Sequence, residues 1–333
     1  MNPGRDLVVL RPEGLYCPAG EFHLDPWRPV ARAVITHGHG DHARGGMGCY
    51  HTTADGLPIL QWRLGEQQYH VHEYGERFRL GDAEVSLHPA GHVLGSAQVR
   101  IVVDGETWVV SGDYKRQPDP TCALFEVQRC DTFITEATFG LPIYRWPHTP
   151  CVAREIVEWR DECAERGEAA ILYCYALGKS QRLLAELAAF TDRPAYVHGA
   201  VDKGVQVYRD AGIAMLPTIP VSETPRDRNE LAGELVLAPP SAAGSAWLRR
   251  FRHAQQGFAS GWMRIRGNRR RRNYDRGFIV SDHADWPDLL RTIEETGASR
   301  VIATHGNTDA LVRALNERGV RTDVFRTDYG GDD

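Results

Sequence analysis

Three histidines and one aspartate lie within six residues, in the motif His37-x-His39-x-Asp41-His42. The motif follows an apolar, β-branched run at 33–36 and precedes a glycine-rich stretch. Burying these side chains without partners would cost several kcal/mol, and a metal ion supplies such a partner. Because side chains alternate in an extended turn, His37 and His39 should point to one position and Asp41 and His42 to another. This arrangement suits two adjacent cations with imidazole and carboxylate ligands.

Short β-rich runs should position these and other polar residues, because several of the runs end directly on a polar side chain. A buried strand that ends in this way presents its last residues to a cleft. The runs of the first half lie at 7–10, 33–36, 84–88, 99–104, 107–113 and 131–137. Near the C-terminus, 276–286 and 299–306 repeat the pattern on either side of a helical segment.

From about residue 150 the pattern becomes helical, at 151–167 and 179–190, with β-like segments at 169–176, 195–199 and 234–240. The α/β character persists while the helix content rises. We therefore predict an α/β fold with one αββα sandwich, formed by residues 1–145 and 266–333. An inserted, helix-rich cap at 146–265 should interrupt it.

The H-x-H-x-D-H motif after a strand resembles the signature of the metallo-β-lactamase superfamily. Three more segments match that family in order. Asp25, in HLDPW, resembles a carboxylate that orients a metal ligand. His92, in PAGHVLGSAQ, resembles the third ligand segment, and Asp113, in VVSGDYK, resembles the carboxylate that bridges both metals.

Three motifs of the second half resemble the β-CASP nucleases, which include Artemis-like DNA repair nucleases and the pre-mRNA 3′-end endonuclease. They contain Glu136 in FITEATFG, His283 in FIVSDHADW and His305 in VIATHGN. In overall pattern the chain is similar to the bacterial ligase-associated DNA exonucleases. The resemblance implies a metallo-β-lactamase αββα sandwich with a β-CASP cap. It also implies two metal ions, one held by His37, His39, His92 and Asp113, the other by Asp41, His42, Asp113 and His305.

The other histidines are expected to be ordinary side chains. His70 and His72, in YHVHEYG, imitate an H-x-H pair, but they lack an acidic partner and follow no comparable strand. The same expectation covers His23, His51, His88, His148, His198 and His253.

A turn at 173–181 places Gly178 and Lys179 where a predicted strand gives way to a helix. A phosphate could bind at that helix N-terminus beside the ammonium, with Tyr175 and Ser180 adjacent. The segment resembles the Y-x-x-G-K turn of Artemis-like nucleases, in which the lysine contacts a terminal 5′-phosphate. It is not a Walker loop, because the upstream glycine is missing at the required spacing. The alternative is a surface lysine.

The formal net charge of −5 does not by itself suggest a nucleic-acid partner, but the distribution of charge does. Seven arginines crowd the segment 264–276, and Trp262 and Tyr274 interleave aromatic rings with them. We expect phosphate contacts from Arg269, Arg270 and Arg271, with a solvated arginine-rich loop as the alternative.

The seven cysteines are odd in number and contain no C-x-x-C pair, which argues against a disulfide framework or a thiolate zinc site. The N-terminal residues contain no export signal, and no stretch reaches the roughly 18 apolar residues of a membrane span. The expected protein is soluble, cytoplasmic and free of any membrane partner.

These features predict a metal-dependent phosphodiesterase in which Asp41, His283 and Glu136 take part in catalysis. His283 is the candidate general acid, oriented by Glu136, because an imidazole near its ordinary pKa can donate a proton near neutral pH. The imidazole-rich ligand set favours zinc, with manganese as the alternative.

The predicted substrate is DNA, single-stranded or with a 5′-phosphate end, and a DNA ligase is the expected functional partner. His305 instead resembles the RNA-acting branch, because Artemis-like DNA nucleases have an aliphatic residue there. An RNA nuclease is thus the first alternative. A small-molecule hydrolase on the same fold is the second, although it would not need Glu136, His283, Lys179 or the arginines. The third is a non-catalytic nucleic-acid-binding subunit, which would be expected to have lost some of the ligand residues.

Overall fold

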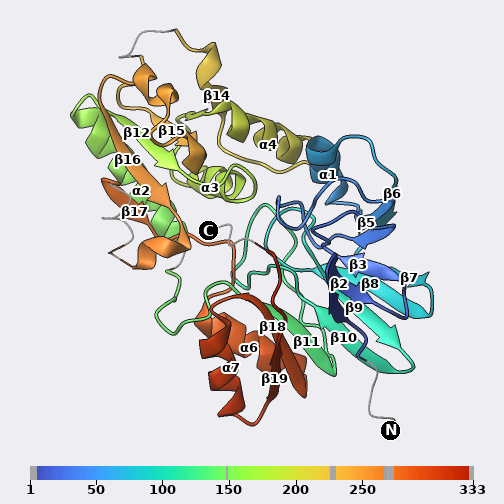
Figure 1. Ribbon diagram of the computed structural model, residues 1–333. Coiled ribbons are helices and arrows are strands. Elements are labelled where there is room, and N and C mark those ends of the chain that lie inside the picture. The colour runs from blue at the N-terminus through green and yellow to red at the C-terminus, as the bar shows by residue number, and fades with distance from the viewer. Residues whose placement is uncertain (1–5, 148, 226–229, 266, 268–273, 330–333) are drawn as a thin grey trace. The chain divides into compact units, whose positions relative to one another are not determined.

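The computed structural model describes residues 6–147, 149–225, 230–265, 267 and 274–329 (Figure 1). They form two compact units. The first comprises 1–142 and 283–331 and the second comprises mainly 143–282. No helix of the described chain is both long and apolar enough to cross a membrane. The seven cysteines all lie in the described ranges and form no disulfide bond there.

The first unit contains two sheets. One has the order β1-β2-β3-β4-β5-β6, and the other has the order β19-β18-β11-β10-β9-β8-β7. The strands of the first sheet are β1 Val9–Arg11, β2 Gly14–Cys17, β3 Phe22–Leu24, β4 Arg32–Val34, β5 Cys49–Thr53 and β6 Tyr69–His72. Those of the second are β7 Arg77–Leu80, β8 Ala83–Pro89, β9 Ala97–Val103, β10 Glu106–Val110, β11 Thr132–Ala137, β18 Arg300–Gly306 and β19 Arg321–Val324.

Successive side chains of a strand point to opposite faces of its sheet. Each sheet therefore packs against the other sheet on one face and against helices on the other, which gives four layers. Val34 packs into the core between the sheets with Val110 and Ile134, whereas the neighbours of these residues face outward. On the outer side of the first sheet, Ala33 packs with Leu60 of α1 Leu57–Leu64. The opposite outer face is covered by α6 Trp286–Thr296 and α7 Thr308–Asn316. This αββα order agrees with the prediction from the sequence.

The second unit is built on a parallel six-stranded sheet of order β14-β13-β15-β12-β16-β17. Its strands are β12 Ala169–Tyr173, β13 Ala195–Val197, β14 Thr218–Pro220, β15 Leu235–Ala238, β16 Ala254–Ala259 and β17 Arg276–Phe278. One face packs against α2 Thr149–Glu165, α3 Lys179–Leu187 and α4 Gly199–Asp210. Short 3-10 turns at Val221–Glu223, Pro240–Ala242, Ala246–Arg250 and Gly261–Arg264 complete its elements.

The inserted unit extends beyond the predicted cap. It begins at 143 and continues to 282, past the expected end at 265. The reason is β17, which pairs with β16 through Gly257–Arg276 and Ala259–Phe278 and so belongs to the sheet of the second unit. The apolar runs of this sheet lack alternation because parallel strands are covered on both faces. Three of the strands, β12, β13 and β15, lie in the β-like segments that the sequence predicts.

Candidate metal centre

The polar residues of the first unit meet at one edge of its second sheet. β10, β11 and β18 run parallel as neighbours, so their C-terminal ends lie at the same edge. Asp113 follows β10. Glu136 and His305 are the second-to-last residues of β11 and β18. β8 points the same way, because it is antiparallel to β9, which is antiparallel to β10, and it delivers His92.

Gly112 allows the chain after β10 to approach the loop that carries the histidine motif. Its φ is +57°, and a Cβ there would lie 2.7 Å from Cβ of Thr36. Only glycine fits both constraints. The contact fixes Asp113 beside the segment that begins at His37.

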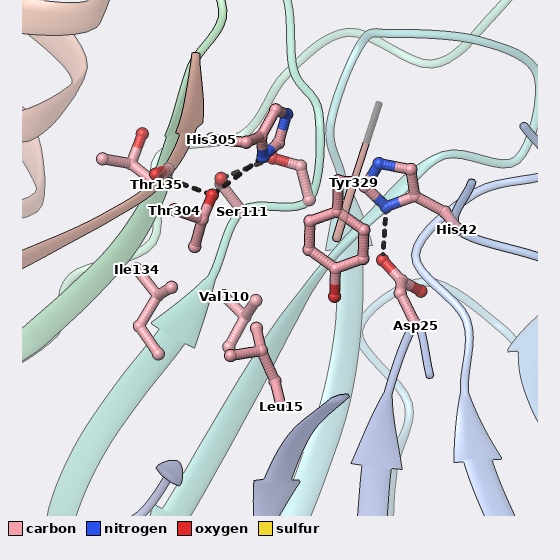
Figure 2. A pocket seen from close by; sticks show the side chains of 11 residues that line it. Leu15, Asp25, His42, Val110, Ser111, Ile134, Thr135, Thr304, His305 and Tyr329 are labelled. Atoms are coloured by element: carbon pink, nitrogen blue, oxygen red, sulfur yellow. Dashed lines mark hydrogen bonds and ion pairs between the residues drawn. The ribbon is translucent and has the colours of Figure 1, made fainter. Parts of the chain in front are cut away.

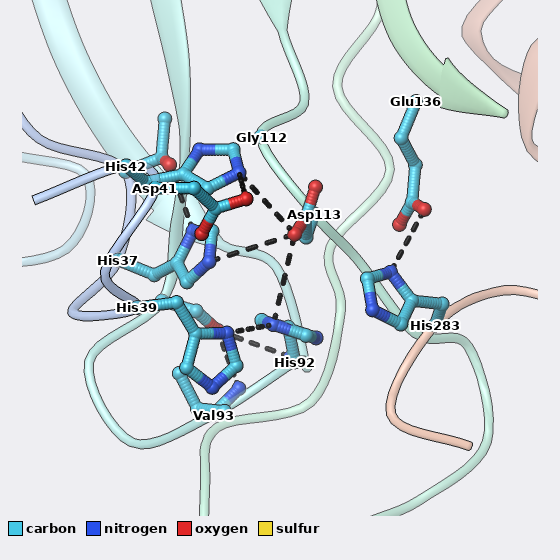
Figure 3. Close-up of polar contacts among 12 residues, drawn as sticks. His37, His39, Asp41, His42, His92, Val93, Gly112, Asp113, Glu136 and His283 are labelled. Atoms are coloured by element: carbon cyan, nitrogen blue, oxygen red, sulfur yellow. Dashed lines mark hydrogen bonds and ion pairs between the residues drawn. The ribbon is translucent and has the colours of Figure 1, made fainter. Parts of the chain in front are cut away.

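The first group of candidate ligands contains His37, His39, His92 and Asp113, whose ligand atoms all lie within 4.8 Å of one another (Figure 3). Nε2 of His92 lies 3.0 Å from Nδ1 of His39. Nε2 of His37 lies 3.6 Å from Oδ2 of Asp113. Imidazole nitrogens and a carboxylate at this spacing can hold a divalent ion.

The second group shares Asp113 with the first. Oδ2 of Asp113 lies 3.4 Å from Nε2 of His42, and its Oδ1 lies 3.2 Å from Nε2 of His305. Asp41 adjoins the group, with Oδ2 3.6 Å from Nε2 of His42. Oδ2 of Asp113 also lies near Nε2 of His37 in the first group, so this one carboxylate adjoins both groups of candidate ligands.

Asp25 fixes the orientation of His42. Its Oδ2 accepts a hydrogen bond from Nδ1 of His42 at 2.8 Å, and its Oδ1 accepts one from the backbone N–H of Thr36 at 2.7 Å. This hydrogen bond fixes the ring of His42 so that Nε2 faces Asp113.

Two buried nitrogens indicate that the cluster fits a metal. Among the described residues, neither Nε2 of His37 nor Nε2 of His42 has a hydrogen-bond partner. Burial, reinforced by the charge of His42, lowers the pKa of His37 well below its ordinary value, so this imidazole stays neutral. A neutral imidazole with an unsatisfied lone pair, as at His37, is the form in which histidine binds a divalent ion.

Glu136 and His283 form a second polar pair beside the cluster. Oε2 of Glu136 accepts a hydrogen bond from Nδ1 of His283 at 2.8 Å, and both side chains are buried. Oε1 of Glu136 accepts the backbone N–H of Tyr114 at 2.8 Å, directly after Asp113. Ligand atoms of Asp113, Glu136 and His283 lie within 4.8 Å of one another.

Tyr329 also belongs to this region, although the sequence did not point to it. Its ring stacks on His42, with centroids 4.4 Å apart and planes at 13° (Figure 2). Burial, followed by the charges of Asp25 and Asp113, raises the pKa of Tyr329 well above its ordinary value, so the phenol stays protonated. An aromatic residue near the end of a chain carries no motif by which it could have been found.

Lys179 of the second unit is not a surface residue. Its side chain is 1% exposed, Nζ lies 3.8 Å from Oδ2 of Asp282, and it lies 5.0 Å from the ring centroid of Tyr175. The hydroxyl of Ser180 donates to the carbonyl of Tyr175 at 2.5 Å.

Two backbone N–H groups at the N-terminus of α3 already donate hydrogen bonds within the protein. The N–H of Gly178 donates to the side chain of Gln181, and that of Ser180 donates to the carbonyl of Tyr175. A phosphate at this position would compete with Asp282 for Lys179 and would not meet those two amides. Arg269, Arg270 and Arg271 lie outside the described residues.

The histidines of β5 and β6 form a separate cluster. His70 and His72 lie within a strand, and His72 has an acidic neighbour, with Nδ1 3.6 Å from Oε1 of Glu76. The expectation that the pair lacks an acidic partner was therefore wrong for His72, whereas neither histidine follows a strand as His37 does. Ligand atoms of Cys49, His51 and His70 lie within 4.8 Å, but the rings of His51 and His70 are nearly parallel, at 15°. Their in-plane lone pairs do not converge on one point.

Two curated proteins are similar to this chain in sequence. A "Probable DNA ligase" of Opitutus terrae is 33% identical over 313 residues, which cover 92% of this chain and 30% of that protein. An "RNase J-like protein" of Methanocaldococcus jannaschii is 26% identical over 231 residues, which cover 60% and 55% of the two chains. The chain thus spans less than two thirds of either relative. No family model matches it.

A solved structure of a protein of unknown function from Enterococcus faecalis has the same fold. Its TM-score is 0.58 at 12% identity, and the match covers 92% of this chain and 81% of that one. The αββα sandwich, its inserted unit and the His/Asp cluster define a metallo-β-lactamase-fold protein. This arrangement agrees with the resemblance to the β-CASP group that the sequence motifs indicate.

Proposed function

We propose that this protein is a metal-dependent phosphodiesterase that hydrolyses nucleic acid. The observation that carries the proposal is the buried pair of Glu136 and His283 beside Asp113. A hydrolase that only needed an activated water could work with the metal cluster alone. An imidazole fixed by a carboxylate next to that cluster supplies a proton donor for a poor leaving group.

The proposed ligands of one ion are His37, His39, His92 and Asp113, and those of the other are Asp41, His42, Asp113 and His305. Two divalent ions bound there would supply an activated water and neutralise charge on the phosphate oxygens. The imidazole-rich set favours zinc, and the carboxylates keep manganese as the alternative. Asp25 holds His42 in the tautomer that such a site needs.

His283 would carry the proton that the leaving oxygen receives. Its Nδ1 is engaged by Glu136, so the transferred proton would be carried by Nε2, the other ring nitrogen. Water attacks phosphorus and releases one proton to solvent, the bond from phosphorus to the leaving oxygen breaks, and the proton from His283 neutralises that oxygen. His283 then regains a proton from solvent. Glu136 stabilises the imidazolium before transfer and keeps the ring oriented.

The finer proposal is that the substrate is DNA and that cleavage starts at a 5′-phosphorylated end. The relative named as a probable DNA ligase matches along 92% of the chain, which supports DNA and a functional link to a ligase. The relative named as RNase J-like favours RNA, as does His305, and RNA is the second candidate. Lys179 would contribute its charge to 5′-phosphate binding in competition with Asp282.

One experiment separates these candidates. Single- and double-stranded DNA and RNA, each with a 5′-phosphate or a 5′-hydroxyl, are labelled at the 3′ end and incubated with zinc or manganese. We expect 5′-phosphorylated DNA to be shortened fastest. Faster cleavage of RNA would replace DNA with RNA as the substrate, and no cleavage of any substrate would contradict the proposed nuclease. An Asp113→Asn preparation, purified in parallel, controls for contaminating nucleases.

A further inference from the structure

Tyr329 touches both histidines of the second candidate metal group. It stacks on His42 and meets His305 edge to face, with ring centroids 5.5 Å apart and planes at 77°. Trp27 packs edge-on against it, with ring centroids 5.5 Å apart, and the phenol donates to the carbonyl of Leu24 at 3.4 Å. The ring of Tyr329 therefore has contacts on its face, its edge and its hydroxyl.

His42 is held from three directions as a result. Asp25 accepts the proton on Nδ1, Tyr329 covers a face of the ring, and Nε2 lies 3.4 Å from Asp113. Rotation of the imidazole would break the hydrogen bond and the stacking contact together. The ring of His37, by contrast, meets the rings of His39 and His92 edge to face and that of His42 at a tilt.

A small pocket adjoins this contact. Tyr329, His42, His305 and Asp25 line it on one side, and the sandwich core contributes Leu15, Val110 and Ile134 on the other. Figure 2 shows the phenol directed toward the apolar residues while the ring stands between the two histidines. Removing the ring would enlarge this pocket and leave both imidazoles without their aromatic neighbour.

We infer that Tyr329 is a positioning residue for the second metal ion, so that the segment after β19 completes the metal centre. The residue binds no metal itself. It fixes the rings of His42 and His305 so that both nitrogens face Asp113 before the ion arrives. The inference rests on the proposed binuclear site, and it predicts an effect on one ion only.

The test measures metal binding rather than cleavage. Metal-free protein is titrated with zinc against a chelator, and the two binding constants are determined for wild type, Tyr329→Ala and Tyr329→Phe. Loss of an outer partner of a metal-binding histidine typically weakens affinity by about 10–100-fold. We expect a loss of that size for the second ion in Tyr329→Ala, an unchanged first ion, and affinities close to wild type in Tyr329→Phe, which keeps the ring.

Tyr69→Ala is the matched control. Tyr69 is also a partly exposed tyrosine of the first unit that donates to a backbone carbonyl, that of Gly65 at 2.9 Å. Its ring packs against that of Tyr50, which is not a candidate ligand, so both ions should bind as in wild type. Tyr329→Leu, which keeps much of the side-chain volume, replaces Tyr329→Ala if the alanine variant does not fold, with the same expected loss.

Four results would overturn the inference. Wild-type affinity for both ions in Tyr329→Ala would show that the stacking is immaterial. Equal weakening of both ions would indicate a general structural role. An equal loss in Tyr329→Phe would assign the effect to the hydroxyl. If wild type bound one ion, the proposed binuclear site would be wrong, and the inference with it. Failure of the proposed site is therefore distinguishable from failure of the role of Tyr329 alone.

Discussion

Glu136 and His283 are 147 residues apart in the sequence, yet Oε2 of Glu136 lies 2.8 Å from Nδ1 of His283. The other oxygen of Glu136 accepts the N–H of Tyr114, so one buried carboxylate connects the proposed proton donor with the segment that carries Asp113. The distance between His283 and the metal cluster is thus set by β11, which carries Glu136 between β10 and β18.

Replacing His283 should slow cleavage without removing metal. Because the residue is proposed to donate a proton rather than to bind an ion, His283→Ala should lower the single-turnover rate by about 10²–10⁴-fold. Elemental analysis should show the wild-type metal content. Glu136→Gln keeps the side-chain volume but removes the negative charge, and it should slow the same step. Loss of an ion from His283→Ala would make this residue a ligand.

Asp113→Asn should abolish hydrolysis and reduce metal content, because both oxygens of this carboxylate face candidate ligands. The control is Asp119→Asn, which breaks a buried ion pair of 2.7 Å with Lys115. Breaking such a pair typically costs about 3–5 kcal/mol. The control should therefore lower Tm but keep its metal. If Asp113→Asn retained wild-type turnover and metal, the shared ligand would be misassigned.

Replacing Lys179 tests the proposed reading of the 5′ end. A terminal phosphate carries nearly one more negative charge than an internal diester near neutral pH, so a nearby ammonium can distinguish the two. Lys179→Met should reduce the rate advantage of 5′-phosphorylated over 5′-hydroxyl DNA and leave cleavage of the hydroxyl substrate little changed.

Lys203→Met, at an exposed lysine of α4 in the same unit, should keep that advantage. Equal cleavage of both substrates by wild type would remove Lys179 from substrate recognition and leave it as a buried partner of Asp282.

The arginine-rich segment 264–276 should contribute to the salt dependence of DNA binding. Replacing Arg269, Arg270, Arg271 and Arg272 with alanine should weaken binding of single-stranded DNA and flatten its salt dependence. The slope of log K against log salt should become shallower by roughly 0.7 for each phosphate that the variant no longer neutralises. Fluorescence anisotropy over a range of salt concentrations measures this slope. A slope equal to that of wild type would favour the alternative, in which these arginines are solvated and contact no phosphate.

His51 should make the fold sensitive to acid. Burial, with smaller contributions from the charges of His70 and His72, lowers the pKa of His51 from 6.5 to about 3. Between these values the unfolded chain binds a proton that the folded chain does not, so stability falls as the pH falls through this window.

His51→Phe removes this proton while it keeps an aromatic ring beside Phe78. Urea unfolding at about pH 7 and about pH 5 should then show a smaller loss of stability for the variant than for wild type. The same loss in both proteins would exclude His51 as a source of the acid sensitivity.

Local spacing was enough to predict the central metal motif. His37, His39, Asp41 and His42 are close in space because they are close in sequence, and an apolar strand before them fixes where they point. The αββα order also followed from short apolar runs, because alternation and strand length are properties of the chain itself.

The remaining relationships required the tertiary structure, because they depend on which distant segments become neighbours. The parallel pairing of β10, β11 and β18 decides that Asp113, Glu136 and His305 share one edge. Packing in the second unit buries Lys179 against Asp282, although its sequence context suggested an accessible turn. The path of the chain after β19 brings Tyr329 onto His42, across a separation that no local pattern encodes.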